Sequence, residues 1–143
     1  ILYVKSEGKD FLAKTHVLIQ EAGSRLQVIG GAAGKHLIHM LRLGVTAFMT
    51  GTEALDIHAS VVSSFLVGKE AEAFHIYCTR ILPYLTFYMD HGIELLKEML
   101  FRRGIISCSE AISPAPRPVL SEVERHEFEW VLQQIDFPGS NGC

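Results

Sequence analysis

The first half of the chain alternates short apolar runs with amphipathic stretches. Residues 1–4 are apolar and lead into a polar segment, which predicts a buried strand that ends near Lys5. Two more strands are predicted at residues 26–29 and 45–49, and apolar residues at helical spacing separate successive strands. The order strand, helix, strand, helix, strand requires parallel strands, because each return to the sheet passes through a helix.

Glycines and capping residues mark where the predicted helices end and begin. The helices between the strands precede Gly23 and Gly44, which stand where a helix typically ends. After the last strand the spacing is helical, and helices are predicted over residues 52–67, 71–89, 93–103 and 121–134. Pro83 is expected to kink the second of these. Ser121 and Glu124 form the capping-box pattern that starts the last one.

Three parallel strands do not make a self-sufficient sheet. The two edge strands are apolar, and native folds cover or close such edges because they promote aggregation. We therefore expect further strands upstream, and the abrupt apolar start looks like the middle of a longer protein. A complete (β/α)8 barrel takes about 250 residues. The predicted fold class is α/β, namely the C-terminal part of a (β/α)8 TIM barrel with its last three strands, followed by a C-terminal helical extension.

The predicted organisation has three parts. Residues 1–67 supply the strands and helices of the barrel, and residues 68–136 form the helical extension. Closely spaced prolines prevent regular structure over much of residues 105–120. The last segment, residues 137–143, contains proline and glycine and is expected to be a flexible tail.

The composition is that of an ordinary single domain. The chain has 143 residues, of which 48% are apolar and 20% charged, and a formal net charge of −3. These values argue against collagen-like, disordered and nucleic-acid-binding chains. No stretch approaches the roughly 20 apolar residues of a membrane span, and no signal-peptide pattern opens the chain. We expect a cytoplasmic protein, and the three cysteines, which lack a CxxC spacing, are predicted to be reduced thiols.

Lys5 stands out because it ends an otherwise apolar strand. Low-dielectric surroundings would disfavour its charged ammonium form and favour a neutral, nucleophilic amine. Such an amine attacks a carbonyl, so one interpretation is a Schiff-base lysine that serves as the electron sink for a 2-oxo acid. The alternative is a lysine at the rim of the sheet that extends into solvent, paired with Glu7 on the same strand face.

Glycines follow the second predicted strand, in the segment Gly30–Lys35. The segment does not match the phosphate-binding P-loop, because it is one residue short and His36 stands where Ser or Thr is required. Two interpretations stay open: the glycines let the backbone approach a small ligand, or they make a tight turn. In a barrel, the carboxyl ends of the strands form the functional face. That face would include Lys5, Gly30, Gly31, Met49, Thr50 and Gly51.

The histidines offer only incomplete metal sites. His36 and His39 are three residues apart, as are His75 and Cys78, but neither pair has a third ligand nearby in the sequence. Complete sites need three or four ligands, so no metal site is predicted. The aromatic residues between positions 77 and 88 have no basic stripe beside them, which favours a core or a subunit interface over nucleic-acid binding.

Several segments, taken in their order and spacing, resemble one enzyme family. Val4-Lys5-Ser6-Glu7 is similar to its sixth strand, Ile29-Gly30-Gly31 to the end of its seventh, and residues 43–51 to its eighth. Residues 68–73, followed by Ile81-Leu82-Pro83, are similar to its helical region. Over nearly its whole length the chain therefore resembles the dihydrodipicolinate synthase and N-acetylneuraminate lyase family of Schiff-base (β/α)8 enzymes.

The resemblance implies that Lys5 is catalytic and forms an imine with the keto group of a 2-oxo acid substrate. It implies substrate-binding positions around that adduct at Gly30, Gly31, Phe48, Met49 and Thr50. No cofactor is needed, because the imine is itself the electrophile. The carboxylate-binding loop and the proton-relay tyrosine belong to the first half of such enzymes, so we expect this portion alone to be inactive. The apolar helical extension predicts a homo-oligomer, either a dimer or a tetramer.

Within the family, three segments look most like the sugar-acid dehydratase branch: residues 48–56, the aromatic run over 81–88 and the proline-rich connection over 113–118. This resemblance implies a hydro-lyase acting on a 2-keto-3-deoxy sugar acid such as 2-keto-3-deoxy-pentonate. A pyruvate-dependent aldolase or lyase, or a dihydrodipicolinate synthase-type condensation, is the alternative within the family. An alternative of another class is a barrel that binds a 2-oxo acid without catalysis.

Overall fold

Three parallel strands form one sheet in the order β1-β2-β3, in a computed structural model that describes residues 2–110 and 120–137. The strands are β1 (Tyr3–Ser6), β2 (Gln27–Gly30) and β3 (Ala47–Phe48). The parallel pairing predicted from the alternation of strands and helices is confirmed. The third strand is shorter than predicted, because only Ala47 and Phe48 pair with β2.

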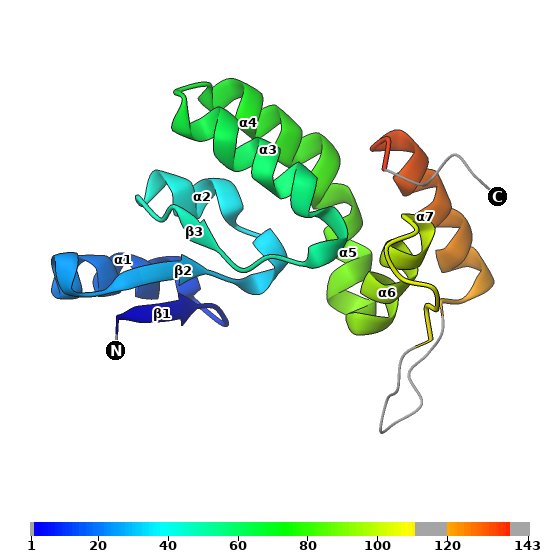
Figure 1. Ribbon diagram of the computed structural model, residues 1–143, viewed down its shortest axis with the longest axis horizontal. Helices are drawn as coiled ribbons and strands as arrows, with labels where there is room; N and C mark the ends of the chain where they lie inside the picture. The colour runs from blue at the N-terminus through cyan, green and yellow to red at the C-terminus, as the bar shows by residue number, and fades with distance from the viewer. Residues whose placement is uncertain (1, 111–119, 138–143) are drawn as a thin grey trace. The chain divides into compact units, whose positions relative to one another are not determined.

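Helices connect these strands, as Figure 1 shows. Helix α1 (Phe11–Ala22) lies between β1 and β2 and is followed by Gly23, whose φ of 53° is in the left-handed region. Helix α2 (Leu37–Arg42) lies between β2 and β3 and is followed by Gly44, with φ 88°. The predicted helix ends at Gly23 and Gly44 are both confirmed. Two short 3-10 turns complete the connections, η1 (Gly23–Arg25) and η2 (Ala32–Gly34).

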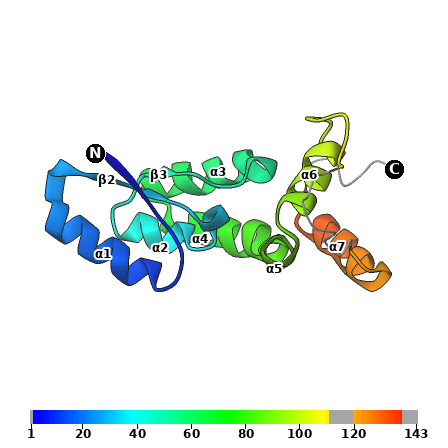
Figure 2. The ribbon, with the colours of Figure 1, turned by 90° about the horizontal axis from the view of Figure 1, so that it is seen from below.

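The core of this region lies between the sheet and helices α1 and α2, which cover the same side of the strands (Figure 2). Its buried residues come from the helices, from β2 and from the segment before β3: Phe11, Val28, Met40 and Val45. Ser6 faces this side as well, because its Oγ lies 2.6 Å from the buried Oγ1 of Thr15 in α1. Successive side chains of a strand alternate between faces. Lys5 therefore projects from the opposite face of the sheet.

The described residues divide into two compact units, which we describe separately. Unit 1 contains the sheet with the residues up to Gly51, together with Leu55–Tyr77. In it, helix α3 (Leu55–Leu66) packs along α4 (Glu70–Ile76) and also contacts α2. Unit 1 extends through α4 to Tyr77, because α4 packs against α3.

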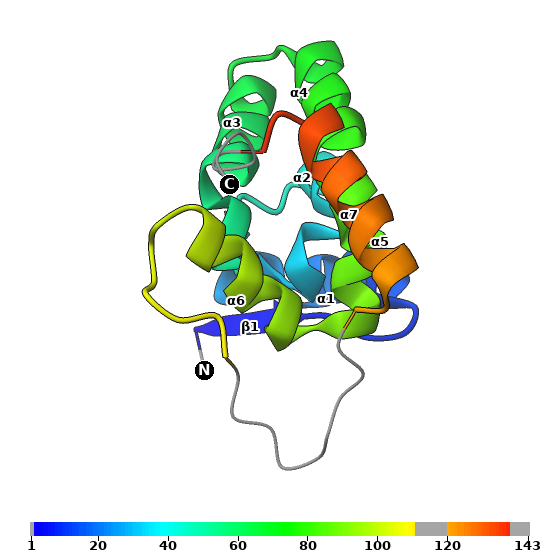
Figure 3. The same cartoon turned by 90° about the vertical axis from the view of Figure 1, so that its right-hand side faces the viewer.

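Unit 2 contains a 3-10 turn, η3 (Thr52–Ala54), and the described residues from Cys78 onward. Its helices are α5 (Leu82–His91), α6 (Ile93–Arg102) and α7 (Glu122–Gln134), and α7 lies beside α5 (Figure 3). Its core consists of apolar and aromatic side chains from all three helices and from the segment after α7: Tyr84, Leu85, Leu95, Met99, Phe128, Leu132 and Phe137.

The long helix predicted over residues 71–89 is interrupted. A π-helical turn, η4 (Tyr77–Ile81), separates α4 from α5, and Pro83 lies in the first turn of α5. Pro83 has no N–H to donate to the carbonyl of Thr79, and its ring would clash with that carbonyl. The regular α-helical pattern therefore breaks just before the proline, as a π turn instead of the predicted simple kink.

At the C-terminal end, the predicted capping box is confirmed. The Ser121 side chain accepts a hydrogen bond from the Glu124 N–H, and the Glu124 carboxylate accepts one from the Ser121 N–H. Of the predicted tail, Phe137 is buried and residues 138–143 lie outside the described part of the chain. The proline-rich connection over 113–118 also lies outside it. None of the helices in residues 2–110 and 120–137 has the length and apolar character that crossing a membrane requires.

Candidate active site

Lys5 lies near the carboxyl end of β1, on the face of the sheet that α1 and α2 do not cover. The sequence predicts low-dielectric surroundings for its amine, and unit 1 does not provide them, because 39% of the side chain is exposed. The reason is local: β1 is an edge strand whose only described strand neighbour is β2. The amine is held in place by a charge partner instead of by burial.

That partner is Glu7, which follows β1. The Nζ of Lys5 lies 3.0 Å from the Oε2 of Glu7. The same oxygen accepts a hydrogen bond of 3.2 Å from the N–H of Ala32. The hydrogen bond from Lys5, followed by that from Ala32, lowers the pKa of the Glu7 carboxyl below its usual value. Glu7 is therefore a carboxylate that links the amine of Lys5 to the loop after β2.

Gly31 provides the space in which these two side chains meet. A Cβ on Gly31 would lie 2.6 Å from the Glu7 Oε2 and 2.7 Å from the Lys5 Cε. The φ of Gly31 is −118°, outside the left-handed region, and the close contacts around it are the reason for glycine that the structure shows. Its N–H donates to the carbonyl of Ser6 at 3.1 Å, which extends the pairing of the strands by one residue.

The loop after Gly31 has an uncommon backbone conformation. Three successive residues have positive φ: Ala32 at 54°, Ala33 at 52° and Gly34 at 79°. Alanine seldom adopts this region, so the surrounding structure must hold the loop in it. The N–H of Ala32 is held by the carboxylate of Glu7, and the following N–H groups of Gly34 and Lys35 bond within the loop.

Two buried side chains support the other end of this loop. The Tyr77 hydroxyl donates a hydrogen bond to the carbonyl of Lys35. His58 of α3 is buried, and a Cβ on Gly34 would lie 2.6 Å from its Nε2. The methyl group of Thr50 approaches Gly34 as well, at 3.4 Å from such a Cβ. The loop is thus held between β1, α3 and the π turn.

The other predicted binding positions lie in two different places. The Phe48 ring packs over Gly30, where a Cβ would lie 2.5 Å from the ring, and it belongs to the core on the helix side. The side chain of Met49 is 56% exposed, and its N–H donates to the Gly30 carbonyl at 2.8 Å. The structure therefore brings Lys5 and Gly31 together but places the Phe48 ring on the opposite face of the sheet.

No metal-binding cluster of three or more His, Cys, Asp or Glu residues is found within residues 2–110 and 120–137. The ring centroids of His36 and His39 are 6.1 Å apart. Burial, then the charges of Lys35 and His39, lower the pKa of His36. His36 also packs against the Phe11 ring, with centroids 4.6 Å apart, so this pair has an evident packing role.

Sequence reasoning raised Glu7 as a possible partner of Lys5 but did not identify the supports of the loop. The spacing of two residues along one strand was sufficient signal for Glu7. His58 and Tyr77 are distant from the loop in sequence, and neither carries a local pattern that points to it. Only the packing of α3 and α4 in unit 1 brings them to the carboxyl end of the sheet.

The fold of this chain is similar to that of a solved structure. The crystal structure of dihydrodipicolinate synthase from Rhodopseudomonas palustris matches 92% of this chain with a TM-score of 0.80 and 25% sequence identity. This likeness supports the dihydrodipicolinate synthase and N-acetylneuraminate lyase family. The match covers 45% of the synthase chain, so this chain spans less than half its length. No protein-family model and no curated protein sequence matches the chain.

Proposed function

We propose that this chain is the C-terminal part of a Schiff-base lyase with a (β/α)8 barrel, in which Lys5 forms an imine with a 2-oxo acid. The observation that carries the proposal is the position of the Lys5 amine. It projects from the carboxyl end of a parallel strand, and Gly31 leaves the space that the Lys5 side chain occupies. Active sites of parallel α/β barrels lie at these strand ends. The likeness to a dihydrodipicolinate synthase supports the same family.

The reaction we propose is the dehydration of a 2-keto-3-deoxy sugar acid such as 2-keto-3-deoxy-pentonate. The Lys5 amine replaces the keto oxygen at C2, and the protonated imine withdraws electrons from C3. A base removes a C3 proton, and the C4 hydroxyl leaves with a proton as water. Hydrolysis of the imine then returns Lys5. The imine supplies the electron sink, so this scheme uses no cofactor.

The proposed pocket consists of backbone and small side chains around the Lys5 adduct. Gly31 is in direct contact with Lys5, and Gly30, Met49 and Thr50 lie at the neighbouring strand ends. For Phe48 we propose a role for the backbone only, because its ring packs on the helix side. Glycine lets a backbone approach a ligand closely, which suits a pocket for a compact 2-oxo acid.

The test is reductive trapping with the full-length protein. Incubation with pyruvate and borohydride, followed by digestion and mass spectrometry, should place the reduced adduct on the peptide that contains Lys5. Lys9, Lys14 and Lys35 lie in the same unit and serve as internal controls, because general surface labelling would modify them as well. An active enzyme with an unlabelled Lys5 would overturn the proposal.

The branch of the family needs a separate experiment, with the 2-keto-3-deoxy acid as substrate. A dehydratase should release a dehydrated semialdehyde, whereas a lyase should release pyruvate and a short aldehyde. Pyruvate as product would replace the dehydratase by the aldolase or lyase alternative. Trapping at Lys5 without turnover of any 2-keto-3-deoxy acid would favour the binding barrel without catalysis.

We also propose a homo-oligomer, either a dimer or a tetramer, in the cytoplasm. Unit 2 exposes large apolar side chains on several helices: Met89, Ile93, Phe101 and Trp130. Apolar residues on a surface favour association with another subunit. Light scattering of the full-length protein should give two or four times the mass of one chain, and a monomeric mass would contradict the proposal.

A further inference from the structure

We propose that Glu7 is an acid–base group of imine formation, additional to the proton-relay tyrosine that the resemblance implies for the first half: it accepts a proton from the Lys5 ammonium and returns it to the hydroxyl that leaves. The inference rests on the proposed function, because it concerns the same amine. It goes further by placing a proton-transfer group within this chain, whereas the resemblance implied a proton-relay tyrosine in the first half of the enzyme.

The geometry of Glu7 supports this role. Its Oε2 lies 3.0 Å from Nζ, the atom that would attack the substrate, so Glu7 touches a reacting atom. That distance is within the range over which a general base accepts a proton directly. The Ala32 N–H holds the same oxygen from the other side at 3.2 Å. Both contacts fix the carboxylate at the amine instead of leaving it free in solvent.

Gly31 and the strained loop position the side chains of Lys5 and Glu7 beside each other. The side chains of Lys5 and Glu7 share the space that a Cβ at Gly31 would occupy. The Ala32 N–H donates to Glu7, and Ala32 itself has a left-handed φ of 54°. Strain of this kind persists where the surrounding structure enforces it, and it is concentrated at functional sites.

A second lysine–glutamate pair in unit 1 has different surroundings from the Lys5–Glu7 pair. Lys69 and Glu72 are 3.2 Å apart, three residues apart along the chain at the start of α4. Their side chains are 62% and 50% exposed, and Glu72 also accepts a hydrogen bond from the hydroxyl of Ser64. This is an ordinary pair on a helix surface. It therefore provides a matched control for the loss of one carboxylate beside a lysine.

The proton movements balance in the proposed step. The Lys5 ammonium gives one proton to the Glu7 carboxylate, and the free amine adds to C2 of the 2-oxo acid. After a second N–H proton has moved to the former keto oxygen, the Glu7 carboxyl donates its proton to the resulting hydroxyl. The C–O bond breaks, water leaves, and the nitrogen lone pair forms the C=N bond. Lys5 is then a protonated imine beside a Glu7 carboxylate, with no net change in charge.

The experiment measures the rate of borohydride trapping by pyruvate in the full-length protein with Glu7→Gln, Glu7→Asp and Glu72→Gln. The glutamine keeps an oxygen for the Ala32 N–H but does not accept a proton, so Glu7→Gln should slow trapping about 100-fold. Aspartate retains the carboxylate with a shorter reach and should lose less. Glu72→Gln should trap at the wild-type rate.

Chemical rescue separates proton transfer from a purely structural role. In Glu7→Ala, added formate should raise the trapping rate in proportion to its concentration, because a small carboxylate can enter the vacated space. Circular dichroism would establish that the variants fold. Trapping by Glu7→Gln at the wild-type rate, or the absence of formate rescue in a folded Glu7→Ala, would overturn the role of Glu7. Absence of any Lys5 adduct in the wild type would instead overturn the proposed function.

Discussion

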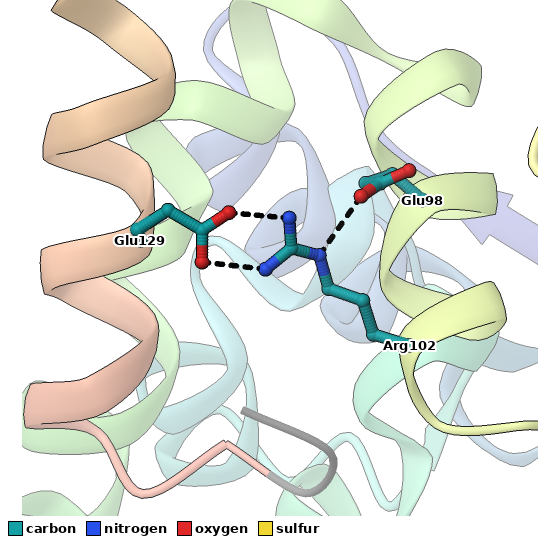
Figure 4. Close-up of polar contacts among 3 residues, drawn as sticks. All are labelled: Glu98, Arg102 and Glu129. Carbon is teal, nitrogen blue, oxygen red and sulfur yellow. Dashed lines mark hydrogen bonds and ion pairs between the residues drawn. The ribbon is translucent and has the colours of Figure 1, made fainter. Parts of the chain in front are cut away.

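Each of the two units contains a cation paired with a carboxylate, and the two sites differ in the number of contacts that the cation makes. In unit 1, the Lys5 amine contacts one carboxylate oxygen, and the side chains of the pair are 39% and 48% exposed. In unit 2, Arg102 of α6 lies between Glu98 on the same helix and Glu129 on α7 (Figure 4). Only 19% of the Arg102 side chain is exposed.

Three hydrogen bonds hold the guanidinium of Arg102. The Nε donates to Glu98 at 2.9 Å, and both terminal nitrogens donate to the two carboxylate oxygens of Glu129. A guanidinium stays protonated and matches a carboxylate in this two-bond geometry. Arg102 therefore links α6 to α7. At the lysine site, one carboxylate oxygen, from Glu7, contacts the amine within the described residues.

Among substitutions outside the Lys5–Glu7 pair itself, the largest effect at the lysine site is expected from Gly31→Ala. The new Cβ would collide with the ends of the Lys5 and Glu7 side chains, which can rotate away. Trapping of pyruvate should fall about tenfold or more, because the reacting atoms lose their alignment. Urea unfolding should change little, since both displaced side chains are flexible and half-exposed.

Gly8→Ala is the control for this change. Gly8 has a φ of 93°, and a Cβ there meets nothing within 4 Å. The substitution should strain the backbone and lower the free energy of unfolding without slowing trapping. Equal trapping rates in Gly31→Ala and Gly8→Ala would show that the space beside Gly31 has no part in the chemistry.

At the arginine site the expected effect is on stability. Arg102→Lys keeps the positive charge but loses the forked geometry, so it should lower the free energy of unfolding by about 1–2 kcal/mol. Trapping at Lys5 should stay at the wild-type rate. The measurement is urea unfolding followed by circular dichroism. A wild-type midpoint for Arg102→Lys would mean that the bonds to Glu129 contribute little.

The smallest expected effect is on the pH dependence of stability. It differs in sign between two carboxyl groups of unit 2, those of Glu129 and Glu53. Arg102 lowers the pKa of Glu129, so this carboxylate contributes stability above its unfolded pKa and loses it as the pH falls. Burial raises the pKa of Glu53, against opposing effects of hydrogen bonds and the Arg103 charge. The stability that Glu53 contributes is present below its unfolded pKa, about 4.3, and is lost as the pH rises through its folded value.

Glu53→Gln tests whether the stability that Glu53 contributes is lost as the pH rises. Glutamine stays neutral, so the variant should gain stability relative to the wild type as the pH rises from 4.5 to about 7.5. Thermal unfolding across that range gives the difference. Glu129→Gln should show the opposite trend, with its disadvantage largest at neutral pH. A pH-independent difference for Glu53→Gln would contradict the raised pKa of Glu53.

Sequence patterns predicted the features that depend on local periodicity. The alternation of short apolar runs and amphipathic stretches was sufficient for the parallel sheet, and Ser121 with Glu124 for the last helix. The position of Lys5 at a strand end also followed from the pattern. Each of these features is set by residues that are close together in the chain, so sequence spacing carries the information.

The features that sequence did not predict depend on contacts between distant segments. Alanine gives no signal for positive φ, so the conformation of Ala32 and Ala33 depends on Glu7 and the rest of the loop's surroundings. The direction of the Phe48 ring depends on its register opposite Gly30.

The most direct measurement of the central claim is carbon NMR of pyruvate labelled with ¹³C at C2, bound to the full-length protein. If Lys5 is the Schiff-base residue, a resonance of an imine carbon should appear beside that of the free ketone. Lys5→Arg, which keeps the positive charge beside Glu7 but has no nucleophilic amine, should abolish it, and Arg102→Lys should retain it. An imine signal that persists in Lys5→Arg would contradict the account.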